Sequence, residues 1–143
     1  MTDWLDKLAE EFRDKRKQDT EAKQNQQAYD SFISGHGEQA WKDLMGLVGE
    51  GCQHLSGTAG ASLKFTRDSE YAFIVTGAPN PLDVEMDYKT KIVSWAVRNT
   101  STKGKLAPDR EGNELVYRVY RETKESVPLS VTDVAAFLLR KAF

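Results

Sequence analysis

The sequence predicts an α+β protein: a five-stranded antiparallel β-meander with one face covered by helices, preceded by a long or broken N-terminal helical segment. Two observations carry this prediction. Between residues 62 and 121, apolar and polar residues alternate in short runs, which is the period of strands with one buried face. Near both ends of the chain, apolar residues instead recur every three to four positions, which is the period of amphipathic helices. The chain of 143 residues is long enough to build a substantial core.

The first helical segment, residues 1–34, is apolar at both ends and polar in the middle. In heptad notation its core-type positions are Leu5, Leu8, Phe12, Lys15, Asp19, Ala22, Gln26, Tyr29 and Ile33. Charged residues at the centre of such a seam make a weak coiled coil. Two arrangements fit this pattern: one long solvated helix held at its ends, or two short helices joined by a mobile polar linker.

A break is expected at Gly35, His36 and Gly37, because glycine is a poor helix former. The prediction therefore divides the chain into an N-terminal helical segment, residues 1–34, and an α+β domain, residues 35–143. The second part should open with a helix over residues 38–55. Its apolar stripe consists of Trp41, Leu44, Met45, Val48, Cys52 and Leu55.

Three glycines, Gly46, Gly49 and Gly51, interrupt that helical stripe. Each weakens a helix by up to about 1 kcal/mol relative to alanine. Their presence predicts either that another part of the chain approaches the helix closely or that the helix frays after Gly49.

The clearest strand pair lies in residues 81–99. A turn at Lys89 and Thr90 lets one register match all the apolar residues: Met86 to Val93, Val84 to Trp95 and Leu82 to Val97. A slip of one residue would turn every apolar side chain toward water, so the inward face is specified.

The same alternation predicts how the other strands pair. The predicted pairs are Leu63 with Val75, Phe65 with Phe73, Val75 with Val84, Phe73 with Met86 and Tyr71 with Tyr88. A fifth strand, with Leu115, Tyr117 and Val119 inward, should follow a loop spanning residues 100–113.

A C-terminal helix should cover the apolar face of the sheet together with the Trp41 helix. Ser130 and Asp133 have the spacing of a capping box, with Asp in place of Glu or Gln. The expected stripe is Val131, Val134, Ala135, Leu138 and Ala142.

Charge and composition limit the classes of partner and compartment. A net charge of −2 gives no bulk electrostatic basis for binding nucleic acid or an anionic membrane. The single cysteine, Cys52, cannot form an internal disulfide, and the acidic N-terminus does not resemble a signal peptide. No apolar run approaches the ~20 residues of a membrane span. We therefore expect a cytoplasmic protein with no nucleic-acid or membrane partner.

The sequence offers little catalytic chemistry, and no catalytic residue is assigned. His36 and His54 lack the spacing of metal ligands, and Cys52 falls on an apolar stripe. Period two places Asp83, Glu85 and Asp87 on one wet face, where they could hold a divalent cation or form an acid–base pair. The simpler interpretation is a solvated face balanced by Arg98 and Arg118. We therefore expect neither a metal nor a cofactor, and the sequence favours a protein that is not an enzyme.

Two functional hypotheses remain. The first is a non-enzymatic interaction or adaptor-type protein that forms a homodimer or binds a protein partner through its N-terminal helix. The partner-binding residues would be Trp4, Leu5, Leu8, Phe12, Tyr29 and Ile33. Packing of these residues on the rest of the chain is the alternative explanation of the same apolar stripe. The second hypothesis is a small-molecule or enzymatic pocket between the sheet and its helices, lined by Tyr88, Trp95 and Tyr117.

Overall fold

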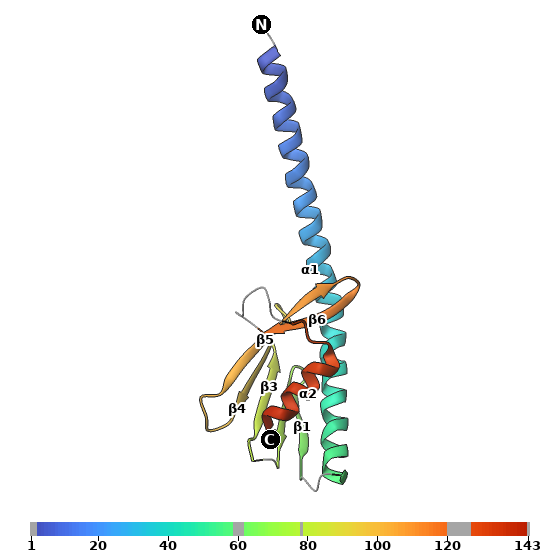
Figure 1. The fold of residues 1–143 in the computed structure, drawn as a ribbon, viewed down its shortest axis with the longest axis vertical. Helices are drawn as coiled ribbons and strands as arrows, with labels where there is room; N and C mark the ends of the chain where they lie inside the picture. Colours follow the sequence, from blue (N-terminus) through green and yellow to red (C-terminus); the bar gives the residue numbers. More distant parts are fainter. Residues whose placement is uncertain (1–2, 59–61, 78, 120–126, 143) are drawn as a thin grey trace. The chain divides into compact units, whose positions relative to one another are not determined.

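The structure, a computed structural model, describes residues 3–58, 62–77, 79–119 and 127–142. Figure 1 shows its elements in chain order: α1 (Asp3–Thr58), β1 (Lys64–Ser69), β2 (Ala72–Thr76), β3 (Leu82–Met86), β4 (Val93–Val97), β5 (Lys103–Glu111), β6 (Glu114–Val119) and α2 (Val131–Ala142). The chain divides into two compact units, Met1–Phe32 and Ile33–Phe143. The predicted α+β class with an antiparallel sheet is confirmed.

The predicted break at Gly35, His36 and Gly37 is wrong, because α1 continues through these residues as one helix of 56 residues. A stripe of buried residues runs through and beyond the glycines: Ile33, Gly37, Ala40, Trp41, Leu44, Met45, Val48 and Cys52. Most helix stability in proteins comes from packing of such a face, which here offsets the low helix propensity of glycine. Of the two arrangements, the long helix is the one observed.

Two of the three glycines in the following part of α1, Gly49 and Gly51, mark the predicted close approach, whereas Gly46 does not. A Cβ atom on Gly51 would lie 2.6 Å from Cδ1 of Leu139 in α2, and one on Gly49 would lie 3.7 Å from the Phe65 ring. The helix does not fray after Gly49 but continues to Thr58.

The sheet has six strands in the order β1-β2-β3-β4-β5-β6, and each strand is antiparallel to its neighbours. The prediction of five strands is therefore wrong by one, since β5 occupies most of the segment that was expected to be a loop. Gly104 of β5 lies opposite Trp95 of β4, and a Cβ atom at Gly104 would come within 2.7 Å of the indole ring. The indole takes the place that a side chain on residue 104 would fill.

The register of β3 against β4 is confirmed at all three predicted pairs. Two other predicted registers are displaced by two residues. Val75 lies opposite Leu82 and Phe73 opposite Val84, and Phe65 lies opposite Val75. A two-residue slip keeps every side chain on its face, so the alternation of apolar residues cannot detect it.

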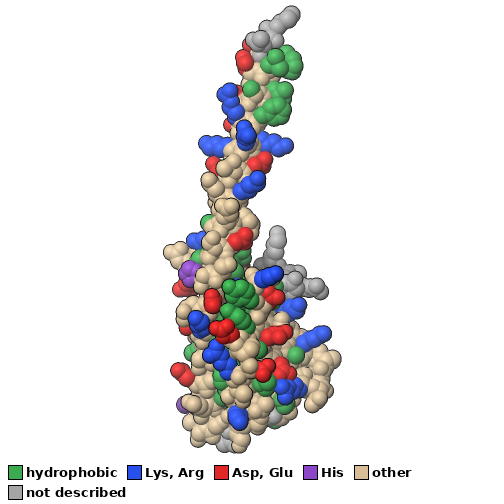
Figure 2. All heavy atoms as spheres, turned by 180° about the vertical axis from the view of Figure 1, so that it is seen from behind, with side chains coloured by type: hydrophobic (Ala, Val, Ile, Leu, Met, Phe, Trp, Pro, Cys, Tyr) green, Lys and Arg blue, Asp and Glu red, His purple; other side chains and the backbone are tan. Residues whose placement is uncertain are grey.

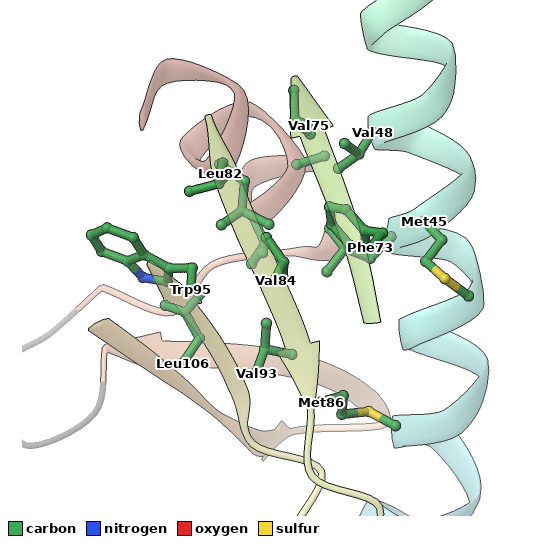
Figure 3. Packing of buried hydrophobic residues seen from close by; sticks show 14 of the residues in the cluster. Met45, Val48, Phe73, Val75, Leu82, Val84, Met86, Val93, Trp95 and Leu106 are labelled. Atoms are coloured by element: carbon green, nitrogen blue, oxygen red, sulfur yellow. The ribbon is translucent and has the colours of Figure 1, made fainter. Parts of the chain in front are cut away.

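One apolar core fills the space between the sheet and its covering helices in the unit Ile33–Phe143. Figure 3 shows Met45 and Val48 of α1 next to Phe73 and Val75 of β2. Trp41 stacks on Phe73 with 5.4 Å between ring centroids, and its indole N–H donates to the carbonyl oxygen of Glu70 at 2.9 Å. The predicted inward orientation of Phe73, Trp95 and Tyr117 is confirmed, because all three belong to this core.

Helix α2 begins with the predicted capping box. The Ser130 hydroxyl accepts the backbone N–H of Asp133 at 3.1 Å, and the Asp133 carboxylate accepts the N–H of Ser130 at 3.3 Å. Four stripe residues of α2 are buried in the core: Val134, Ala135, Leu138 and Ala142.

The two outer strands of the sheet end in different ways. The pairing of β1 with β2 is irregular between Arg67 and Ser69, where the register shifts. On the other side, Tyr117 of β6 and Leu129 exchange two backbone hydrogen bonds of 2.8 Å. Leu129 thus pairs with β6 just before α2 begins.

Candidate functional site

The unit Met1–Phe32 carries an exposed apolar stripe close to the start of α1. Figure 2 shows hydrophobic side chains grouped there, followed by charged side chains of both signs. Trp4 and Phe12 are each 64% exposed, Leu5 is 48% exposed and Leu8 is 37% exposed. These four residues, hereafter the N-terminal stripe, recur at helical spacing and so share one side of α1. Exposed large apolar side chains in such a group are typical of an interaction site.

The other two predicted partner-binding residues differ from the N-terminal stripe. Tyr29 is half-buried, and Ile33 is 9% exposed and forms part of the second unit. Ile33 is therefore a packing residue and offers little surface to a partner.

The three residues predicted to line a pocket do not lie in one environment. Tyr88 is 60% exposed, its ring lies 5.4 Å from that of Tyr71, and the ammonium group of Lys91 lies 4.1 Å from its ring centroid. Trp95 and Tyr117 are buried in the core. All three occupy alternate positions that the sequence predicts to face inward, but Tyr88 follows the end of β3 and lies in a turn.

Tyr117 has a buried hydroxyl group. Its Oη atom has no hydrogen-bond partner among the residues that the structure describes. Burial raises the pKa of Tyr117 well above its ordinary value, because the phenolate would lose its hydration. The phenol therefore stays neutral, as a side chain of the core.

The opposite face of the sheet bears an open depression of about 750 Å³. Ser94 and Ala96 of β4 separate acidic residues on β3 from lysines on β5, and the lining includes Ala72, Ile74, Asp83, Glu85, Ser94, Ala96, Lys103 and Lys105. This surface is not predicted from the sequence, because Lys103 and Lys105 fall in the segment expected to be a loop. The alternation of Lys103 and Lys105 with Gly104 and Leu106 was the available signal, but Gly104 and Pro108 obscured it.

Two of the predicted carboxylates, Asp83 on β3 and Asp87 just after it, have separate structural roles. Asp83 accepts hydrogen bonds from the guanidinium of Arg98 at 3.0–3.2 Å, which confirms the predicted balance at that position. Asp87 accepts the backbone N–H groups of Thr90 and Lys89, and these hydrogen bonds lower the pKa of the Asp87 carboxyl group. In the described ranges, no group of three or more His, Cys, Asp or Glu residues could hold a metal ion.

Arg118 does not balance the β3 carboxylates as expected. It pairs instead with Asp109 at 2.7 Å and with Glu111 at 3.7 Å across the β5–β6 hairpin. These contacts join two adjacent strands and give the hairpin a mixed surface of acidic and basic groups.

Cys52 and the two histidines lie in different environments. Cys52 is buried, and desolvation raises the pKa of its thiol, which disfavours the reactive thiolate. His36 and His54 are both exposed, and they lie 18 positions apart on α1. The thiol is a core group in this structure.

Three comparisons, with protein-family models, with curated proteins and with solved structures, found no match for this chain.

Proposed function

We propose that this chain is a non-enzymatic interaction or adaptor-type protein that binds a protein surface through the N-terminal stripe of α1. The observation that carries the proposal is the exposure of Trp4, Leu5, Leu8 and Phe12 on one side of an otherwise polar helical segment. Fully burying such a side chain contributes about 1.5–3 kcal/mol. Trp in particular is enriched among the residues that dominate binding energy at protein interfaces.

The charges around the stripe support a protein partner over a membrane surface. Helices that lie on membranes combine an apolar face with a basic polar face. Here the flanking residues mix both signs, with Lys7 and Arg13 beside Asp6 and Glu10. No helix in the described part of the chain has the length and apolarity needed to cross a bilayer. As part of the proposal we place the protein in the cytoplasm, because Cys52 is a free thiol.

The proposal is tested by replacing Trp4, Leu8 and Phe12 with serine in the full chain. The matched control replaces the exposed polar residues Lys7, Glu10 and Asp14 with serine on the same turns.

We expect the stripe variant, but not the control, to lose association in sedimentation velocity and to lose proteins that co-purify with the wild-type chain. The core should remain folded in both variants by near-UV circular dichroism, since none of the replaced residues is buried. If the stripe variant keeps the same mass and the same bound proteins as the wild type, the proposal is wrong.

A further inference from the structure

The seam of core-type positions in the unit Met1–Phe32 contains two adjacent charges of opposite sign. In heptad order the seam reads Leu5, Leu8, Phe12, Lys15, Asp19, Ala22, Gln26 and Tyr29. Lys15 and Asp19 are both exposed, and so are Ala22 and Gln26. A second helix that packs on this seam must therefore accommodate a cation and an anion at its centre.

A parallel, in-register pair of these helices would place like charges together. Each seam residue would face its own copy, so Lys15 would meet Lys15 and Asp19 would meet Asp19. Like charges that face each other across an interface are unfavourable. Glu11 and Arg16 would gain an attraction in that arrangement, but they flank the seam at the solvated rim, where ion pairs contribute little.

In an antiparallel pair of helices, Lys15 no longer faces Lys15 and Asp19 no longer faces Asp19. Centring the overlap between Lys15 and Asp19 sets Lys15 of each helix opposite Asp19 of the other, so the two-fold axis creates two attractive contacts. In this register the large side chain of Phe12 faces the small Ala22, and Leu5 faces Tyr29. All of these residues belong to the unit Met1–Phe32.

Neighbouring antiparallel registers are less favourable. Lengthening the overlap by one heptad requires Ile33 to face Leu8, but Ile33 is buried in the second unit. Shortening it by one heptad sets Phe12 against Lys15 and Leu8 against Asp19, which brings each charge against an apolar side chain. Shortening it by two heptads leaves Asp19 and the residues after it outside the overlap.

We propose that the N-terminal stripe binds a second copy of this chain, with residues 5–29 of the two helices antiparallel and Lys15 of each facing Asp19 of the other. This inference rests on the proposed function, because it names the occupant of the same stripe. The charges at the centre fix the orientation, while Leu5 and Phe12 supply the apolar contacts at the seam toward each end, Leu8 faces Gln26, and Trp4 flanks the seam.

The first test is a charge exchange in the full chain. Lys15→Asp puts a second carboxylate opposite Asp19, so we expect the dimer dissociation constant from sedimentation equilibrium to rise about tenfold. The double variant Lys15→Asp/Asp19→Lys restores opposite charges and should recover the affinity. Far-UV circular dichroism of each variant controls for altered helicity. In a parallel dimer the double variant would not recover affinity, because like charges face each other in the wild type and in both variants.

The salt dependence of the dimer dissociation constant is an independent test on the unmodified protein. Raising NaCl from about 50 to 500 mM screens the attraction between Lys15 and Asp19, so the antiparallel dimer should weaken. A parallel dimer should instead tighten, because screening relieves repulsion between its like charges. A dimer that tightens as salt rises contradicts the proposed arrangement.

Two spin labels measure the orientation directly. Asp3 and Lys17 occupy equivalent heptad positions on the side of the helix away from the seam. Each is replaced in turn by a labelled cysteine in a Cys52→Ala background. In the proposed dimer the two labels at residue 17 lie level with each other, whereas those at residue 3 are separated by about 42 Å along the axis. Equal label distances at the two sites would overturn the proposal.

The outcomes separate this inference from the proposed function. If the wild-type chain stays monomeric but a different protein is lost with the Trp4, Leu8 and Phe12 variant, self-pairing is wrong and the interaction function stands. If association is unaffected by that variant, both proposals fail. A dimer with unequal label distances that weakens on Lys15→Asp and recovers on the exchange supports both.

Discussion

Two parts of helix α1 differ sharply in how they are stabilised. From Asp3 to Phe32, a range the structure describes in full, no residue is buried. From Ile33 to Thr58, eight residues are buried and contribute a continuous face to the core. Both parts have the same secondary structure, but among the described residues only the second contributes buried side chains to the core.

One regular helix can therefore be stabilised in two different ways along its length. In the second part, apolar burial stabilises the helix even across Gly37. In the first part, the sequence relies on good helix formers and on contacts one turn apart, such as the hydrogen bond of 2.9 Å from Gln26 to Asp30. A helix of the first kind is marginal alone and gains most from a partner.

The largest expected difference lies between two aromatic residues on the same helix. Trp41→Ala should lower the free energy of unfolding by about 3–5 kcal/mol, because it empties a fully packed site against Phe73. Phe12→Ala should change it by less than about 0.5 kcal/mol in the monomer, because Phe12 is exposed. Urea unfolding at low protein concentration measures both values. Similar losses for the two variants would contradict the contrast between the two parts of α1.

The second-largest expected effect on stability is at Gly104 of β5, which packs against Trp95 of β4. Gly104→Ala should destabilise the protein by about 1–3 kcal/mol, because the new methyl group would overlap the Trp95 indole ring. A displaced indole should also shift the tryptophan fluorescence spectrum. If Gly104→Ala is neutral, the close packing of Trp95 on β5 is incorrect.

Tyr117→Phe removes a buried hydroxyl group without altering the shape of the ring. We expect the free energy of unfolding to rise by about 1 kcal/mol near neutral pH, since the Oη atom has no partner among the described residues.

The pH dependence of the same variant gives a second measurement. Because the folded-state pKa of Tyr117 is raised, its ionisation leaves the free energy of unfolding unchanged below its unfolded-state pKa of about 10 and lowers it as pH rises above that value. The Phe variant should lose this alkaline decrease. Thermal unfolding between about pH 8 and 11 compares the two proteins, and equal slopes would show that Tyr117 does not contribute.

The smallest expected effect is the difference in stability between alanine variants of two glycines in the packed part of α1, Gly46 and Gly51. Apart from its chain neighbours and its own helix backbone, no described atom lies within 4 Å of a Cβ placed on Gly46, so Gly46→Ala should stabilise the protein by about 0.5–1 kcal/mol. Gly51→Ala should lack this gain, because its methyl group would meet Leu139 of α2. The difference between the two variants in urea unfolding measures the approach of α2 to α1, and equal gains would place α2 farther away.

The sequence predicts the faces of the sheet better than its registers. Alternation specifies which side of each strand is buried, and Phe73, Val84 and Trp95 all lie on the predicted side. Register depends in addition on the length and geometry of each turn. The β3–β4 pair keeps the predicted register around a turn that backbone hydrogen bonds of Asp87 with Lys91 and Ile92 close, whereas the β2–β3 pair was displaced by two residues without any loss of alternation.

Strand β5 escaped prediction for a physical reason. Leu106 is its only buried residue, and Gly104 and Pro108 both disfavour a strand interior. Pairing on both sides, with β4 and with β6, outweighs these local preferences.

Only part of the candidate site could be predicted from the sequence. The N-terminal stripe stands out because large apolar residues interrupt a polar helix, so its residues could be selected without a structure. Ile33 could not be separated from that stripe by its spacing, because the same helical period continues into the core. Its burial depends on the sheet that packs against it, which a pattern along one helix does not reveal.

The outer strands of the sheet have a consequence for solubility. An open sheet exposes unpaired backbone groups along its two margins, which can recruit strands from other molecules and start aggregation. Here the bulge between Arg67 and Ser69, within a charged strand, disturbs one margin, and Leu129 occupies part of the other. Both devices hinder growth of the sheet by further strands. They are compatible with the proposed contact between molecules through helix α1, which requires no intermolecular sheet.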